Sequence, residues 1–219
     1  MKKDKENEII LKTSEYIQEV FSHEGSGHDW FHIDRVRNLA LKIWKTEGGD
    51  RYLIEMSALM HDLDDWKLTG KNQANRTEAW LRRLKVSPEV AHDITEVIKQ
   101  VSFKGAGVPD QVKTLEAAVV QDADRLDAMG AIGIARTFAY GGYKKRLIYH
   151  PGIHPEIHTD AEVYKTNSSP TINHFHEKLL LLKDRMNTQT ARNMATQRHE
   201  FMLRYLDEFF LEWNEASKA

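Results

Sequence analysis

Four side chains with metal-ligand chemistry lie on helix faces that otherwise carry small or apolar residues. They are His32, His61, Asp62 and Asp124. A carboxylate on such a face is costly to bury unless another group pairs with it. Taken singly, each has an ordinary explanation, because a histidine on an apolar face is most often a hydrogen-bonded core residue and an aspartate can end a helix. Taken together, they need several independent partners, whereas one divalent cation would satisfy all four.

The composition of this set indicates the kind of ion. Two neutral imidazole nitrogens and two carboxylates suit Mn²⁺, Ni²⁺, Co²⁺, Fe²⁺ or Mg²⁺ better than a metal that prefers thiolates, and the chain has no cysteine. We expect one divalent ion, with Mn²⁺ as the first choice. Four protein ligands leave octahedral positions open for water, and a bound water is acidified enough to attack an electrophile near neutral pH.

The elements that must position these ligands read as helices. β-Branched alternating runs are nearly absent, and residues 140–170, rich in Gly, Pro, His and Tyr, are the only long irregular stretch. The simplest fold is all-α, one domain with its last two helices packed back onto the first six. Periodicity predicts the helices at about 6–22, 29–46, 50–63, 72–85, 88–101, 112–139, 171–187 and 189–215.

Composition limits the class of protein. In 219 residues, 31 Lys and Arg against 33 Asp and Glu leave a formal net charge of −2, which argues against a dedicated nucleic-acid binder. The charged N-terminal segment lacks the apolar run of a signal peptide, and no stretch approaches the roughly 20 apolar residues of a membrane helix. We therefore expect a soluble, cytoplasmic protein with no membrane partner. The sequence carries no signal for its oligomeric state.

Three motifs resemble a known family. The elements HIDRV at 32–36, HD at 61–62 and QDADRLDA at 121–128 are similar to the H…HD…D pattern of the HD-domain metal-dependent phosphohydrolases. The order and spacing are specific, whereas a lone HD dipeptide is not. A second one, His92-Asp93, lies off the apolar stripe of its helix, and we assign it to a solvated face.

The resemblance to the HD core covers about residues 25–140. Beyond it, GAIGIARTFAYGG and NHFHEKLLLLKDRMNT resemble a bacterial subgroup of compact, stand-alone HD hydrolases. The resemblance implies a single HD-type helical bundle over 1–219, with a loop at 140–170 and C-terminal helices at 171–215 packed on it. It also implies hydrolysis of phosphate esters or anhydrides. In this subgroup a nucleoside triphosphate or its deoxy form is converted to the monophosphate and pyrophosphate, so a nucleotide is the implied substrate.

The same resemblance assigns roles to residues. It makes the four side chains metal ligands, and the subgroup's H-D-x-x-D-x-K is continued here by Asp65 and Lys67. Asp65 follows Asp62 by just under one helical turn, so we expect it to orient or deprotonate the attacking water. The alternative is an ion pair with Lys67 or Arg125. Lys67 would clamp a phosphate, or else be a surface lysine.

Two further basic residues are candidates for substrate binding. Lys104 follows a helix end in SFKGAG, where its ammonium and free backbone N–H groups could hold a triphosphate tail. A lysine there would also interact favourably with the helix dipole. Arg146 lies in the loop at 140–170, whose tyrosines could stack on a base, although long loops are either functional or mobile.

Other functions fit parts of the pattern. The same metal centre could serve a nucleotide phosphomonoesterase or phosphodiesterase. A non-enzymatic reading is a helical signalling module that binds a nucleotide without turning it over, and the complete ligand set speaks against it.

Overall fold

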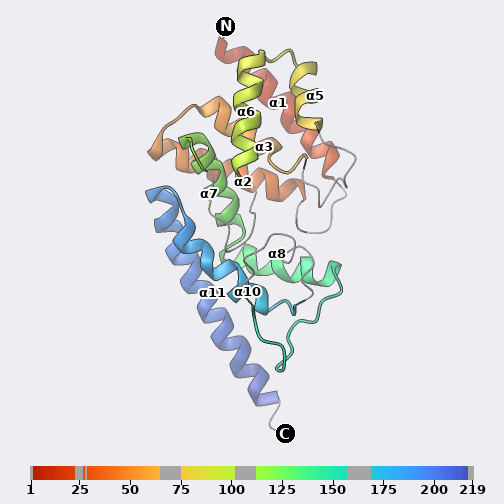
Figure 1. The fold of residues 1–219 in the computed structure, drawn as a ribbon, viewed down its shortest axis with the longest axis vertical. Coiled ribbons are helices and arrows are strands. Elements are labelled where there is room, and N and C mark those ends of the chain that lie inside the picture. The colour runs from red at the N-terminus through yellow and green to blue at the C-terminus, as the bar shows by residue number, and fades with distance from the viewer. Residues whose placement is uncertain are drawn as a thin grey trace. The chain divides into compact units, whose positions relative to one another are not determined.

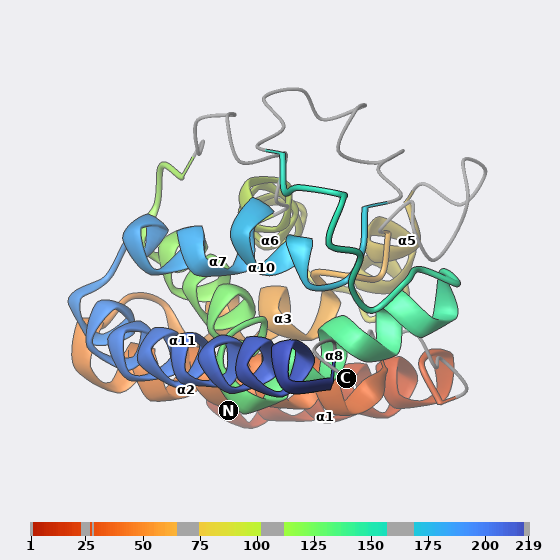
Figure 2. The ribbon, with the colours of Figure 1, turned by 90° about the horizontal axis from the view of Figure 1, so that it is seen from below.

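The computed structural model describes residues 2–22, 27, 29–64, 75–101, 112–156 and 169–216. Within these residues the chain forms helices and no strands, which confirms the predicted all-α class (Figures 1 and 2). The elements are α1 (Lys2–Val20), α2 (Trp30–Glu47), α3 (Arg51–Met60), α5 (Arg76–Arg83), α6 (Pro88–Val101), α7 (Leu115–Asp127), α8 (Gly130–Tyr143), α10 (Asn173–Glu177), the 3₁₀ helix η1 (Leu179–Arg185) and α11 (Gln189–Ala216). None of these helices is long and apolar enough to cross a membrane.

The chain divides into two compact units. The N-terminal unit comprises Met1–Lys104 and Pro109–Asp124, and the C-terminal unit comprises Gly105–Val108 and Arg125–Ala219. The boundary falls inside α7, directly after Asp124. That residues 1–219 act as a single domain therefore stays a prediction.

In the N-terminal unit, α3 packs against α1, α2 and α6, and α5 packs against α6. Two consecutive glycines connect α2 to α3: Gly48 and Gly49 have φ of +84° and +92°, a region that other residues rarely adopt. Asp50 then starts α3, because its carboxylate accepts hydrogen bonds from the backbone N–H groups of Tyr52 (2.8 Å) and Leu53 (3.1 Å). The short turn brings the start of α2 and the end of α3 to the same end of the unit.

A buried ion pair links these two helices. Glu55 of α3 is fully buried, and its Oε1 accepts hydrogen bonds from Nε (2.9 Å) and Nη2 (2.5 Å) of Arg37 on α2. Its Oε2 lies 3.0 Å from Nη2 of Arg51. A buried carboxylate needs such partners because its desolvation is costly. The pair fixes how α2 lies along α3.

In the C-terminal unit, α11 packs against α8 and η1 (Figure 2). Phe175 is fully buried and stacks on Tyr205 of α11 at 5.8 Å between ring centroids. The guanidinium groups of Arg125 and Arg198 donate to the main-chain carbonyls of Arg185 and Leu126, which ties the end of α7 to η1 and α11.

The structure corrects two predicted helices. The helix predicted at 112–139 is broken, because Met129 is extended and Gly130 has φ of +70°, which no right-handed helix can include. A Cβ at Gly130 would lie 3.1 Å from Cγ of Arg198, so a glycine fits this close approach. The helix predicted at 171–187 is a short α10 followed by η1, because Lys178 leaves helical geometry at φ −144°.

The buried ion pair predicts a large effect of one substitution. Glu55→Ala leaves two arginines without their shared carboxylate, and we expect it to lower the free energy of unfolding by about 3 kcal/mol, the low end for buried pairs because both arginines reach solvent. Glu8→Ala is the control, since its pair with Lys12 is exposed and should contribute little to stability. Urea unfolding measures the free energy of unfolding of both variants. Equal decreases in the two variants would show that the ion pair of Glu55 does not stabilise the packing of α2 on α3.

Candidate metal centre

His32 is placed by the first turn of α2. The side chain of Asp29 caps this helix and accepts the backbone N–H of His32 at 2.8 Å. The imidazole points inward and is fully buried. Helix capping therefore sets the depth at which this ring enters the N-terminal unit.

His61 and Asp62 lie in the turn that follows α3. Nδ1 of His61 lies 2.8 Å from the carbonyl oxygen of Ala58. A carbonyl can only accept, so Nδ1 carries the proton and Nε2 of the neutral ring presents its lone pair. This arrangement is the usual way in which a protein orients a ligating histidine.

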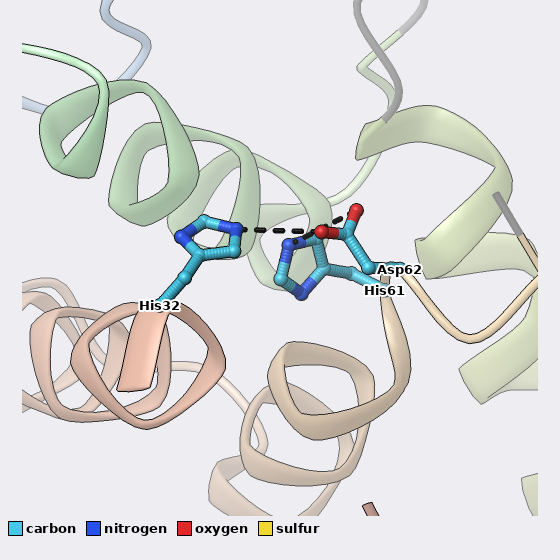
Figure 3. A group of neighbouring side chains, drawn as sticks. All are labelled: His32, His61 and Asp62. Carbon is cyan, nitrogen blue, oxygen red and sulfur yellow. Dashed lines mark ion pairs between the residues drawn. The ribbon is translucent and has the colours of Figure 1, made fainter. Parts of the chain in front are cut away.

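Three of the four predicted ligands, His32, His61 and Asp62, form one group in the N-terminal unit, and Asp124 lies near both histidines but outside that group. Nε2 of His32 lies 3.4 Å from Oδ2 of Asp62 and 3.7 Å from Oδ1 of Asp124. Nε2 of His61 lies 3.5 Å from Oδ1 of Asp62 and 3.9 Å from Oδ1 of Asp124. The two imidazoles meet edge to face, with 5.3 Å between ring centroids. Figure 3 shows both rings and the Asp62 carboxylate pointing toward one another.

These distances fit a shared ion better than direct hydrogen bonds, which have N···O distances of roughly 2.7–3.2 Å. Atoms bound to one octahedral ion at about 2.1 Å lie roughly 3.0 Å apart in adjacent positions and about 4.2 Å apart in opposite ones. Ligand atoms of His32, His61 and Asp62 all lie within 4.8 Å of one another. In addition, Nε2 of His61 is buried without a hydrogen-bond partner among the described residues. The residues present therefore fit a divalent cation.

The candidate ligands differ in their exposure to solvent. The side chains of both histidines are at most 2% exposed and that of Asp62 is 9% exposed, whereas that of Asp124 is 31% exposed. Low dielectric around the histidines strengthens their interaction with a cation.

The described structure does not place the other predicted site residues relative to this centre. Asp65, Lys67 and Lys104 lie outside the described residues. Arg146 belongs to the C-terminal unit, where its guanidinium lies 5.7 Å from the ring centroid of Tyr140. The roles proposed for these four residues stay predictions.

The second HD dipeptide behaves as predicted. His92 and Asp93 are both exposed on α6, whose buried face carries Ile94, Val97 and Val101. The dipeptide His-Asp therefore also occurs in this chain on an exposed helix face, and it does not by itself mark a metal site.

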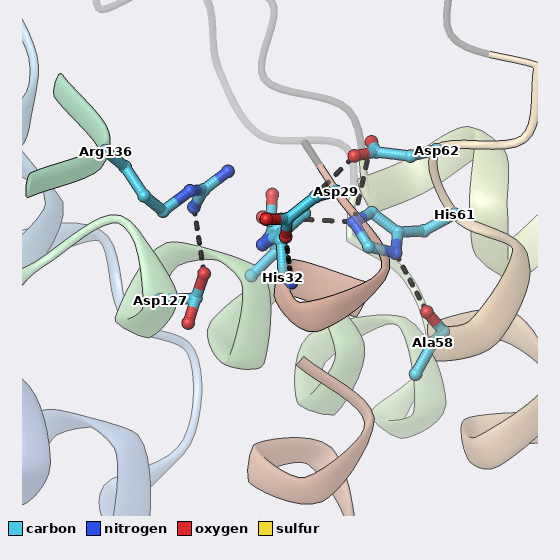
Figure 4. A network of polar contacts seen from close by, with 8 residues as sticks. Asp29, His32, Ala58, His61, Asp62, Asp127 and Arg136 are labelled. Carbon is cyan, nitrogen blue, oxygen red and sulfur yellow. Dashed lines mark hydrogen bonds and ion pairs between the residues drawn. The ribbon is translucent and has the colours of Figure 1, made fainter. Parts of the chain in front are cut away.

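Sequence reasoning missed two carboxylates. Asp64 accepts backbone N–H groups of Arg76 (2.8 Å) and Thr77 (3.2 Å) at the start of α5. In the C-terminal unit, the buried Asp127 pairs with Nη1 of Arg136 at 3.0 Å (Figure 4). No local signal marks either pair, because the partners lie nine to thirteen residues apart in the sequence.

Comparisons with known proteins agree with this centre. The HD domain family matches residues 30–129. The chain is 38% identical over 194 residues to the protein YpgQ of Bacillus subtilis, which covers 87% of each chain.

Solved structures extend the similarity to nearly the whole chain. A crystal structure from Lactobacillus plantarum has a TM-score of 0.87 and 36% identity, covering 94% of this chain and 97% of that one. An HD-superfamily hydrolase from Bacillus thuringiensis has a TM-score of 0.73 and 41% identity, covering 95% and 98%. YpgQ in complex with ADP has a TM-score of 0.74 and 36% identity, covering 93% and 97%. With its H…HD…D side chains gathered in one place, this chain belongs to the HD domain family of metal-dependent phosphohydrolases and is similar to YpgQ.

Proposed function

We propose that this protein is a nucleoside triphosphate pyrophosphohydrolase that converts an NTP or dNTP to the monophosphate and pyrophosphate. The observation that carries the proposal is the convergence of two imidazole nitrogens and two carboxylates in the N-terminal unit. A nucleotide as substrate is supported by YpgQ, which was crystallised with ADP. The sequence motifs after the HD core support the triphosphate.

His32, His61, Asp62 and Asp124 would hold the ion, with Mn²⁺ as the first choice and Ni²⁺, Co²⁺, Fe²⁺ or Mg²⁺ as alternatives. When bound, a divalent ion supplies an acidified water and offsets the charge of the phosphate oxygens. The two carboxylates balance the charge of the ion. The hydrogen bond from His61 to Ala58 keeps that imidazole in the tautomer that can bind.

The remaining roles come from the motifs. Asp65 would take the proton of the water that attacks the α-phosphorus, while the bond from this phosphorus to the bridging oxygen breaks and pyrophosphate leaves. Lys67 would stabilise the charge that develops on the phosphate oxygens. Lys104 and Arg146 would bind the rest of the triphosphate, since positive charge around the transferred group is the main requirement of phosphoryl transfer.

Removing one ligand should weaken metal binding strongly. We expect His61→Ala to weaken Mn²⁺ binding, measured by isothermal titration calorimetry, by at least about 100-fold and to abolish turnover, because its imidazole would be a direct ligand. Asp124→Ala should do the same, with helicity by circular dichroism nearly unchanged. His92→Ala is the matched control, since this histidine also precedes an aspartate but is exposed, and it should keep both properties. Full turnover in His61→Ala would contradict the ligand assignment.

Product analysis tests the reaction. A panel of NTPs, dNTPs, nucleoside monophosphates and cyclic nucleotides, incubated with Mn²⁺, Co²⁺, Ni²⁺ or Mg²⁺, should yield monophosphate and pyrophosphate in equal amounts from triphosphates. Nucleoside diphosphate with inorganic phosphate would indicate stepwise removal of terminal phosphates, and phosphate from a monophosphate would indicate a phosphomonoesterase. Binding of metal and nucleotide without any turnover would favour the signalling module.

The proposed base can be separated from the ligands kinetically. Asp65→Asn keeps the shape of the side chain but cannot accept the proton, so we expect kcat to fall by about 10²–10⁴-fold. The dissociation constant for Mn²⁺ should stay within about twofold of the wild type, because Asp65 is not proposed as a ligand. An unchanged kcat would remove Asp65 from the mechanism.

A further inference from the structure

The turn that carries Asp62 is held on both sides of this residue. Before it, His61 donates from Nδ1 to the Ala58 carbonyl at 2.8 Å. After it, Leu63 is fully buried in the hydrophobic core and donates its backbone N–H to Met60 at 3.0 Å. A carboxylate in such a turn has little freedom, provided that the chain beyond Leu63 is also fixed.

Asp64 supplies this last attachment. Its Oδ1 accepts the backbone N–H of Arg76 at 2.8 Å and its Oδ2 accepts that of Thr77 at 3.2 Å. These are the first two N–H groups of α5, which have no partner within the helix. The residue at the ordinary capping position, Asn75, adopts a left-handed conformation with φ of 90° and makes no capping hydrogen bond. Asp64 therefore caps α5 from twelve residues upstream.

The helix that Asp64 caps is itself well anchored. Leu81 is fully buried, and Trp80 stacks on Tyr16 of α1 with ring centroids 3.9 Å apart. Nε1 of Trp80 donates to Oγ1 of Thr13 at 3.0 Å. The negative charge of Asp64 is also favourable at the positive end of the helix dipole. Through Asp64, the turn after α3 is thus attached to a helix that packs independently on α1 and α6.

We propose that Asp64 is a positioning residue for the metal centre: by capping α5 it fixes the turn 61–64 and so the direction of the Asp62 carboxylate. The inference rests on the proposed function, because it takes Asp62 as a metal ligand. Asp62 lies two residues before the cap, and its oxygens already lie 3.4 and 3.5 Å from the two imidazole nitrogens. A turn released from α5 could rotate this carboxylate away, whereas the two histidines would keep their own supports.

Two substitutions of Asp64 compare complete and partial loss of the cap. Asp64→Ala removes the cap, and we expect the dissociation constant for Co²⁺ to rise about 10-fold, the low end for residues that orient a ligand. The visible absorption spectrum of bound Co²⁺, which reports ligand geometry, should change as well. Asp64→Asn keeps one acceptor oxygen, which can still accept the N–H of Arg76, but loses the charge and the second acceptor, which serves Thr77. It should stay within about threefold of the wild type in affinity and keep the wild-type spectrum.

Asp50→Ala is the matched control. Asp50 also caps its helix with two backbone hydrogen bonds, to Tyr52 and Leu53, at the end of α3 opposite the metal centre. We expect it to lower the unfolding midpoint about as much as Asp64→Ala and to leave Co²⁺ affinity and spectrum unchanged. All variants are compared in the full chain by calorimetry, visible absorption and circular dichroism, and the loss of one cap is small enough for both alanine variants to fold.

Each result decides the proposal. Wild-type affinity and spectrum in Asp64→Ala would overturn it, as would an Asp64→Asn variant as weak as Asp64→Ala, because the remaining hydrogen bond to Arg76 would then not hold the turn. An equal loss in Asp50→Ala would also overturn it, since any destabilised helix would have the same effect. If the wild-type protein binds no divalent metal, the metal assignment itself fails, which distinguishes that failure from a failure of the Asp64 inference.

Discussion

The N-terminal unit depends on one electrostatic requirement: two aspartates and two imidazoles must lie close together in a largely buried place. Without a cation, the Asp62 carboxylate, whose side chain is 9% exposed, loses hydration, and Nε2 of His61 is buried without a hydrogen-bond partner among the described residues. A divalent ion removes both costs at once and binds the imidazole lone pairs, one of which is fixed toward the cluster by the His61–Ala58 hydrogen bond. The arrangement is therefore understandable as a metal site and difficult to understand as core packing.

Three features in and next to the helices α2 and α3 bring these side chains together. The glycine turn at 48–49 reverses the chain, so that His32 at the start of α2 faces His61 at the end of α3. The buried Glu55 pair fixes how the two helices lie along each other. Finally, the cap from Asp64 to α5 holds the turn after α3. The glycine turn sets the direction of the chain, the Glu55 pair sets the register of the two helices, and the Asp64 cap limits rotation of the turn. Together they restrict the positions of the candidate ligands.

The four candidate ligands could be singled out from the sequence because they break a helical pattern, and such a break is a local signal. His32 and Asp124 are ninety-two residues apart, yet each is conspicuous among its own neighbours. The break between α7 and α8 was missed because small and apolar residues continue through Met129 and Gly130, and only the positive φ of Gly130 ends the helix. The η1 segment was missed because a run of four leucines is equally compatible with an α-helix and a 3₁₀ helix. The role of Asp64 was missed for another reason, since its partners are set by tertiary packing.

The most direct test of the account is the position of a bound ion. Crystals soaked in MnCl₂ and measured near the manganese absorption edge should show one strong anomalous peak in the N-terminal unit. We expect this peak to lie about 2.0–2.3 Å from Nε2 of both His32 and His61 and from one oxygen each of Asp62 and Asp124. A fully soaked crystal with no peak there, or with the ion held by other side chains, would contradict it.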